Sequence, residues 1–206
     1  MGTVKSLLLG MCFVLGACTS QTSTVQTTEK GTQWEWQNGT IVVKTPERPA
    51  GQKSVLGLTT PKLEAVRVGF VGLGMRGPGA VERFTYIPGT QVVALCDYEE
   101  ARADKCQELL KKASMPKAAV YSGDKGYEEL CKRDDIDLVY VAADWLHHFP
   151  VAKCALENGK NVAIEVPSAM NLQECWDLIN LSESTRKHCF ILENCCYDWF
   201  EMNTLN

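Results

Sequence analysis

The sequence predicts an α/β fold in which helices cover both faces of a doubly wound parallel sheet. From residue 65 onwards, short runs rich in valine, isoleucine and leucine alternate with longer amphipathic segments. A cluster of glycines directly follows the first of these runs, where a strand would turn tightly into a helix. The chain has 206 residues, of which 45% are hydrophobic and 22% are charged, as in an ordinary globular protein.

The expected elements follow one another regularly along this part of the chain. Strands are expected at residues 66–71, 91–96, near 120, 137–143, 161–164 and 189–192. Helices are expected just after Gly77 and at residues 99–113, 126–132, 150–157 and 172–184, with a further helix starting at 197–198. Because parallel strands end at the same edge of a sheet, the residues that follow them should meet there.

A glycine-rich turn, Gly72-Leu-Gly74-Met-Arg-Gly77, gives the first functional indication. In dinucleotide-binding loops of this spacing, the first glycine permits the turn and the second lets the backbone approach the pyrophosphate. The third glycine lets the helix and the strand pack closely, and the helix presents its free amides to the phosphates. The sequence therefore predicts a Rossmann-type NAD(P)-binding domain over residues 65–206.

An acidic residue at the end of the second strand indicates which dinucleotide is bound. Asp97 lies twenty residues after Gly77, where a carboxylate accepts hydrogen bonds from the adenosine ribose. Glu99 and Glu100 add negative charge that would repel a 2′-phosphate. NAD is therefore the expected cofactor, in preference to NADP.

The first residues have the pattern of a bacterial export signal. Lys5 precedes an apolar run at 7–17, which is about half as long as a membrane-spanning helix. The run ends in Leu15-Gly-Ala-Cys18, which resembles a lipobox, so residues 1–17 are expected to be removed and Cys18 lipidated. No acidic residue follows Cys18 directly, which favours the outer over the inner membrane of the bacterial envelope. The alternative is a chance cysteine in an ordinary signal peptide.

Residues 18–64 are expected to form a lipidated tether and an N-terminal arm. The segment 19–32 is rich in serine, threonine and glutamine, which favours a flexible connection. Alternating residues predict short strands at 33–36 and 40–43.

Charge and cysteine spacing exclude other classes of function. The net charge of −4 provides no basic surface for nucleic acid, so the expected partner is a small molecule or another protein, with a homo-oligomer left open. The ten cysteines include no Cys-x-x-Cys pair, and no metal site is expected. Most are expected to be small buried residues, although export would permit disulfides.

Several motifs resemble a family of nicotinamide-dependent proteins. The pattern from His148 through Ala155–Val162 to Glu165-x-Pro167 is similar to the Gfo/Idh/MocA sugar oxidoreductases. Three stretches resemble glycoside hydrolase family 109 more closely, namely Gly72–Ala80, Ala94–Asp97 and Leu192–Tyr197. Members of that family are NAD-dependent α-N-acetylgalactosaminidases and are often bacterial lipoproteins.

The resemblance implies a glycosidase that uses tightly bound NAD. In such enzymes the sugar is oxidised at C3, a proton is lost from C2, the aglycone leaves from C1, water adds and the ketone is reduced again. With the glycine loop, the resemblance implies cofactor contacts at Gly72, Gly74, Met75, Arg76, Gly77, Asp97, Trp145, Leu146, His147, His148, Glu165, Val166 and Asn194. It also implies a C-terminal α/β substrate domain with the catalytic residues beyond Asn206, so this chain is expected to be the NAD-binding half.

Alternatives remain open at this point. Val166 stands where dehydrogenases of the wider family carry a lysine that can move protons, and this favours the glycosidase branch. The other two hypotheses are that the protein is a sugar dehydrogenase or a non-catalytic NAD-binding fragment. For His148 the alternative to a cofactor contact is a capping role, and for Glu165 it is a structural ion pair.

Overall fold

The computed structural model describes residues 26–27 and 33–204 of the chain. It divides into two compact units, one that ends at Lys44 and one that begins at Thr45. The signal segment 1–17 and the lipidation site Cys18 lie outside the described residues and stay predictions. Within the described ranges, no helix combines the length and hydropathy that crossing a bilayer requires.

The N-terminal unit contains a small antiparallel sheet. Its strands are β1 (Gln26–Thr27), β2 (Gln33–Gln37) and β3 (Thr40–Val43), in the order β1-β2-β3. Asn38 and Gly39 connect β2 to β3 with φ values of 50° and 77°, which is the left-handed geometry that tight hairpins prefer. The two strands predicted at 33–36 and 40–43 are therefore confirmed.

The second unit is built on a six-stranded parallel sheet. Its strands are β4 (Val66–Val71), β5 (Thr90–Asp97), β6 (Ala119–Ser122), β7 (Leu138–Val141), β8 (Asn161–Ile164) and β9 (Cys189–Ile191). Their order in the sheet is β6-β5-β4-β7-β8-β9. The chain starts at the centre, runs outward through β5 and β6, and then returns to the other side of β4 with β7. The doubly wound parallel sheet is confirmed, and its switch point lies between β4 and β7.

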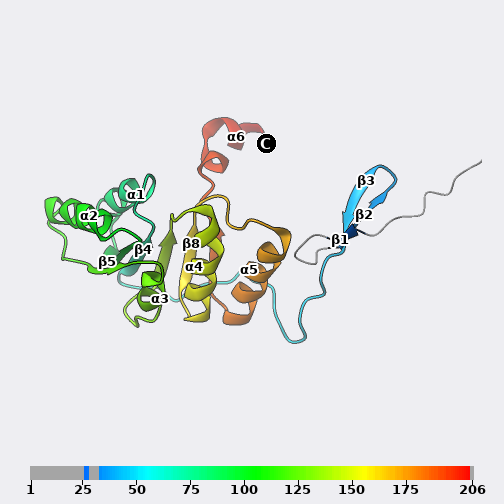
Figure 1. The fold of residues 1–206 in the computed structure, drawn as a ribbon, viewed down its shortest axis with the longest axis horizontal. Coiled ribbons are helices and arrows are strands. Elements are labelled where there is room, and N and C mark those ends of the chain that lie inside the picture. The colour runs from blue at the N-terminus through cyan, green and yellow to red at the C-terminus, as the bar shows by residue number, and fades with distance from the viewer. Residues whose placement is uncertain (1–25, 28–32, 205–206) are drawn as a thin grey trace, which may run out of the picture. The chain divides into compact units, whose positions relative to one another are not determined.

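Helices cover the two faces of this sheet (Figure 1). On one face, α1 (Gly77–Phe84) and α2 (Glu100–Lys112) bury Val81 and Leu110 against Val68 and Phe70 of β4. On the other face, α3 (Gly126–Cys131), α4 (Trp145–Glu157) and α5 (Leu172–Thr185) pack over the side chains that alternate with these, such as Val71. The chain then continues through a 3-10 helix η1 (Asn194–Tyr197) and α6 (Trp199–Thr204).

Two predicted helix starts were wrong. Helix α4 begins at Trp145 instead of 150, because the Asp144 side chain caps it by accepting a hydrogen bond from the Leu146 backbone N–H at 3.0 Å. Pro150 therefore lies inside the helix. The last helix begins at Trp199, after the separate 3-10 turn, and not at 197–198.

The arm that precedes the six-stranded sheet is hydrogen-bonded to α5. The Arg48 guanidinium donates two hydrogen bonds to the Glu183 carboxylate, at 2.8 and 3.0 Å, and Gln52 donates to the same carboxylate at 3.0 Å. Glu183 is only 3% exposed. Farther along, Arg186 donates to the backbone carbonyl of Ser54 at 3.0 Å. Residues 48–54 thus contact α5 and the residue that follows it before the chain enters β4.

The described cysteines, Cys96 and those after it, are free thiols. Cys96, Cys106 and Cys131 are buried, as predicted, and burial raises the pKa of Cys96 to about 12. Cys154 and Cys189 are half-buried, whereas Cys175, Cys195 and Cys196 are exposed, so the prediction that most cysteines are buried was wrong for the described ones.

Candidate functional site

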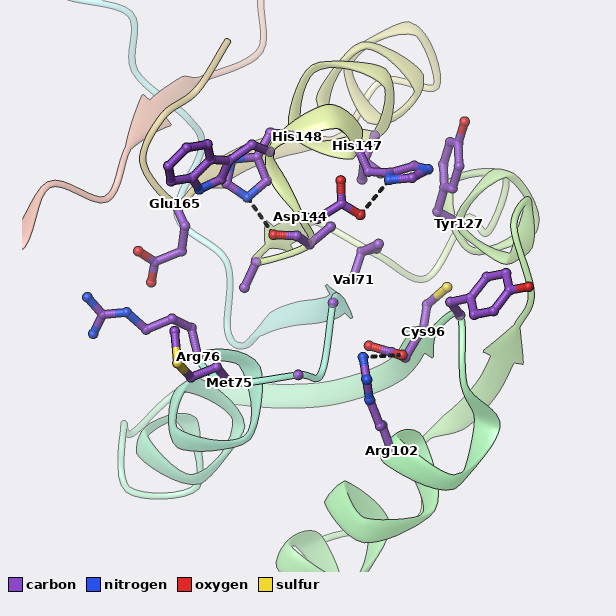
Figure 2. A pocket seen from close by; sticks show the side chains of 18 of the residues that line it. Val71, Met75, Arg76, Cys96, Arg102, Tyr127, Asp144, His147, His148 and Glu165 are labelled. Carbon is purple, nitrogen blue, oxygen red and sulfur yellow. Dashed lines mark hydrogen bonds and ion pairs between the residues drawn. The ribbon is translucent and has the colours of Figure 1, made fainter. Parts of the chain in front are cut away.

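A cavity of about 480 Å³ opens at the C-terminal ends of β4, β5 and β7 (Figure 2). The glycine loop, the end of β5, the β6–α3 turn and the first turn of α4 contribute to its lining. Its volume is typical of small-molecule sites. Its position is the one at which doubly wound sheets bind ligands, beside the switch point.

The structure gives a different reason for glycine at each of the three positions of the loop. A Cβ on Gly72 would lie 2.3 Å from the Ala143 backbone nitrogen, and one on Gly77 would lie 2.1 Å from the Gly72 carbonyl oxygen. Both glycines are therefore required by the packing of the chain on itself. A Cβ on Gly74 would meet nothing closer than Arg102 Nη1 at 3.6 Å. The space beside Gly74 is thus free for the close approach of another molecule.

Helix α1 presents its N-terminus beside this loop. Its N-cap residue, Arg76, makes no side-chain capping hydrogen bond, so the first backbone amides of α1 have no side-chain acceptor there. Amides at such a terminus, with the helix dipole, favour a phosphate. The loop and the helix therefore fit the pyrophosphate of a dinucleotide.

Asp97 holds the glycine loop to the end of β5. It is 6% exposed, and its Oδ2 accepts a hydrogen bond from the Leu73 backbone N–H at 2.6 Å. Its Oδ1 accepts from the Glu99 backbone N–H at 3.0 Å and lies 3.4 Å from Arg102 Nη1. An ionised carboxylate has about four acceptor positions, so one remains for a ribose hydroxyl. Asp97 thus shapes the loop and also lines the cavity.

The first turn of α4 forms the opposite wall. His147 Nδ1 lies 2.6 Å from Asp144 Oδ2 (Figure 2). Its Nε2 lies 3.8 Å from Asp124 Oδ1. Burial raises the pKa of Asp144, but the hydrogen bonds from His147 and from the backbone outweigh this effect and hold the pKa below its usual value. His147 thus joins the start of α4 to the β6–α3 turn.

His148 lines the cavity with its ring buried between two loops, and its contact with a cofactor stays a prediction. It is 1% exposed, with Nδ1 2.7 Å from the Pro167 carbonyl oxygen and Nε2 2.9 Å from the Ala143 carbonyl oxygen. Each ring nitrogen therefore lies within hydrogen-bonding distance of a backbone carbonyl oxygen. Its ring holds the loops after β7 and β8 together at the cavity wall, and it leaves no ring nitrogen free for a ligand.

Glu165 follows β8 and lines the cavity beside Val166. Its Oε1 accepts a hydrogen bond from the hydroxyl of Tyr140 at 2.8 Å. Tyr140 is buried and stacks on Phe70, with ring centroids 5.1 Å apart. Burial, followed by the bond to Glu165, raises the pKa of Tyr140 to about 12. Among the residues that the structure describes, the contact that holds Glu165 is this hydrogen bond from a neutral hydroxyl, and no ion pair to Glu165 is formed.

Most of the predicted site residues converge on this cavity, namely Gly72, Gly74, Met75, Arg76, Asp97, Trp145, His147, His148, Glu165 and Val166. Three others lie outside its lining. Gly77 is buried behind the loop, Leu146 is 73% exposed on the first turn of α4, and Asn194 begins the 3-10 helix. Their contact with a cofactor stays a prediction.

The sequence reasoning missed several lining residues. Arg102, Asp124 and Tyr127 all line the cavity. Arg102 lies in the first turn of the helix after Asp97, so its spacing from that acid could have identified it. Asp124 and Tyr127 follow β6, whose C-terminal end belongs to the same edge of the sheet.

Comparison with known proteins agrees with this geometry. Residues 66–192 match the GFO_IDH_MocA family, described as an oxidoreductase family with an NAD-binding Rossmann fold. A myo-inositol dehydrogenase from Lactobacillus casei, solved in complex with NAD(H) and myo-inositol, superposes with a TM-score of 0.58 at 24% identity. The superposition covers 68% of this chain and 42% of that one, and it shows the shared fold.

Two relatives are much more similar in sequence. Glycosyl hydrolase family 109 protein 4 of Phocaeicola vulgatus is 81% identical over 100% of this chain, and protein 1 of Bacteroides thetaiotaomicron is 57% identical over 98% of it. The chain spans 40% and 42% of the lengths of these two relatives. With its NAD-binding Rossmann domain, the chain therefore belongs to the Gfo/Idh/MocA family of oxidoreductases, and within it to glycosyl hydrolase family 109.

Proposed function

We propose that this chain is the NAD-binding half of a glycosidase that hydrolyses α-N-acetylgalactosaminides. The observation that carries the proposal is the cavity at the switch point, with open space at Gly74 and a buried carboxylate at Asp97. Its support from other proteins is the high identity to family 109 proteins along the whole chain.

In this proposal the described residues bind and orient the cofactor. The space at Gly74 and the amides of α1 receive the pyrophosphate, and Asp97 receives the adenosine ribose. When bound, NAD supplies reversible oxidation of the sugar at C3, which acidifies the proton at C2 and permits loss of the aglycone. Glu165 lies across the cavity from Arg102, which contacts Asp97 (Figure 2), so the nicotinamide end would lie near Glu165 and its neighbour Val166.

Val166 favours hydrolysis over net oxidation. Its side chain is 38% exposed at the cavity and has no group that can transfer a proton. The lysine that dehydrogenases of the wider family are expected to have here is absent. We therefore place the acid–base groups in the part of the relatives that this chain does not span, and we expect the 206-residue chain to bind NAD without hydrolysing the glycoside.

The test compares this chain with one extended to the length of its relatives. Each is incubated with p-nitrophenyl α-N-acetylgalactosaminide in deuterated water, and p-nitrophenol, NADH and deuterium at C2 of the released sugar are measured. The extended protein should release p-nitrophenol and incorporate deuterium without net NADH. Accumulation of NADH would identify a sugar dehydrogenase instead, and hydrolysis by the short chain would show that its own residues suffice.

A further inference from the structure

Arg102 occupies the edge of the cavity where β5 ends and α2 begins (Figure 2). Its Nη1 lies 3.4 Å from Asp97 Oδ1, and its Nη2 donates a hydrogen bond to Glu99 Oε1 at 2.9 Å. The same Nη1 is the atom nearest to the open space at Gly74. The guanidinium therefore lies between the glycine loop and two carboxylates.

This edge is where the adenosine ribose lies in domains of this topology. The acid at the end of the second strand contacts the 2′-hydroxyl of NAD, whereas a nearby arginine accommodates the 2′-phosphate of NADP. This chain carries both kinds of residue within six positions. A guanidinium binds phosphate with paired hydrogen bonds, so Arg102 is the group that NADP would use.

The two carboxylates differ in what they hold. Asp97 is buried and fixes the backbone of Leu73, so the shape of the loop depends on it. The Glu99 side chain is 57% exposed, and its ion pair is with Arg102. Exposed pairs of this kind contribute little to the stability of the fold. Glu99 is thus the partner that can be removed without changing the loop.

We propose that Glu99 sets the selectivity for NAD over NADP by engaging the Arg102 guanidinium, which would otherwise bind a 2′-phosphate. The two carboxylates together carry one more charge than the guanidinium neutralises. A 2′-phosphate is therefore repelled by the excess negative charge, and it finds the Arg102 guanidinium already paired with Glu99. The inference rests on the proposed binding of NAD in this cavity, and it concerns a choice of cofactor that does not depend on the sugar.

The test measures the dissociation constants of NAD and NADP by calorimetry on the 206-residue chain and its variants. Glu99→Gln should improve NADP binding about tenfold relative to NAD, because it removes both the repulsion and the competition for Arg102. Glu100→Gln is the matched control, since it removes the same charge from a residue that contacts Ser122 Oγ at 3.4 Å. The control should change the ratio by no more than about threefold, since it alters only an exposed, screened charge. Adding Arg102→Gln to Glu99→Gln should abolish the gain.

Two outcomes would overturn the inference while NAD binding persists. Equal shifts in Glu99→Gln and Glu100→Gln would mean that only net charge matters. A gain that survives in the Glu99→Gln/Arg102→Gln double variant would place the phosphate on another residue. If the unmodified chain bound neither NAD nor NADP, the cofactor site itself would be wrong, and the inference would fall with it.

Discussion

Alanine at Gly77 should lower the stability of the protein, whereas alanine at Gly74 should leave stability almost unchanged and weaken cofactor binding. The Cβ of Gly77→Ala would be placed 2.1 Å from the Gly72 carbonyl oxygen, so the backbone must move. Overpacking of this kind costs about 3 kcal/mol, which corresponds to a fall in Tm of roughly 6–12 °C for a domain of this size. The Cβ of Gly74→Ala meets its nearest protein atom at 3.6 Å, so its Tm should stay within about 2 °C of the wild type.

Gly74→Ala should instead weaken the binding of NAD. Its added methyl group occupies the space proposed for the pyrophosphate, so the dissociation constant should rise by more than about tenfold, or 1.4 kcal/mol. Thermal unfolding followed by circular dichroism gives the first quantity, and calorimetric titration with NAD gives the second. Wild-type affinity in Gly74→Ala, or an equal loss of Tm in both variants, would refute this account of the loop.

Three further outcomes follow from the described contacts and the predicted anchor. Tyr140→Phe removes the donor to Glu165 and should lower the free energy of unfolding by about 1–2 kcal/mol in urea titrations; no change would mean that water replaces the hydroxyl. The hydrogen bonds from Arg48, and next from Gln52, hold the pKa of Glu183 below its usual value. The stabilisation that these bonds provide is therefore complete above about pH 4.3, and it is lost as pH falls through the pKa of Glu183 in the folded state. Glu183→Gln should therefore flatten the acid limb of the urea midpoint plotted against pH. Cys18→Ala should move the protein from membrane to soluble fractions in a bacterial host, and unchanged fractionation would refute lipidation at that residue.

Much of the fold follows from short-range patterns in the sequence. The run of residues before Gly72 has no polar interruption except Arg67, as expected for a strand buried on both faces. The glycine spacing then requires a strand, a turn and a helix in that order, and β4 and α1 have these positions. Such signals are reliable because each one reflects a local steric demand.

Parts of the site depend on contacts that the sequence does not reveal. The carbonyl oxygens that bracket His148 belong to Ala143, after β7, and to Pro167, after β8, and Pro167 is nineteen residues from His148 in the sequence. A histidine in a binding loop and one that ties two loops together have the same sequence signature. The start of α4 was missed for a related reason, since Pro150 suggested a first turn while Asp144 supplied the actual cap.

The fastening of the arm to α5 has a mechanical consequence for any load on the N-terminal side. Beyond Ser54 the backbone leads into β4 and from there directly to Gly72, so tension along the chain would pull on the glycine loop. Two sets of contacts at α5 would bear this tension first. They are the paired hydrogen bonds from Arg48 to Glu183 and the hydrogen bond from Arg186 to the arm. A force that strips the arm must break these contacts before it displaces the loop. We therefore expect these contacts to keep the glycine loop in place when the chain before residue 45 moves.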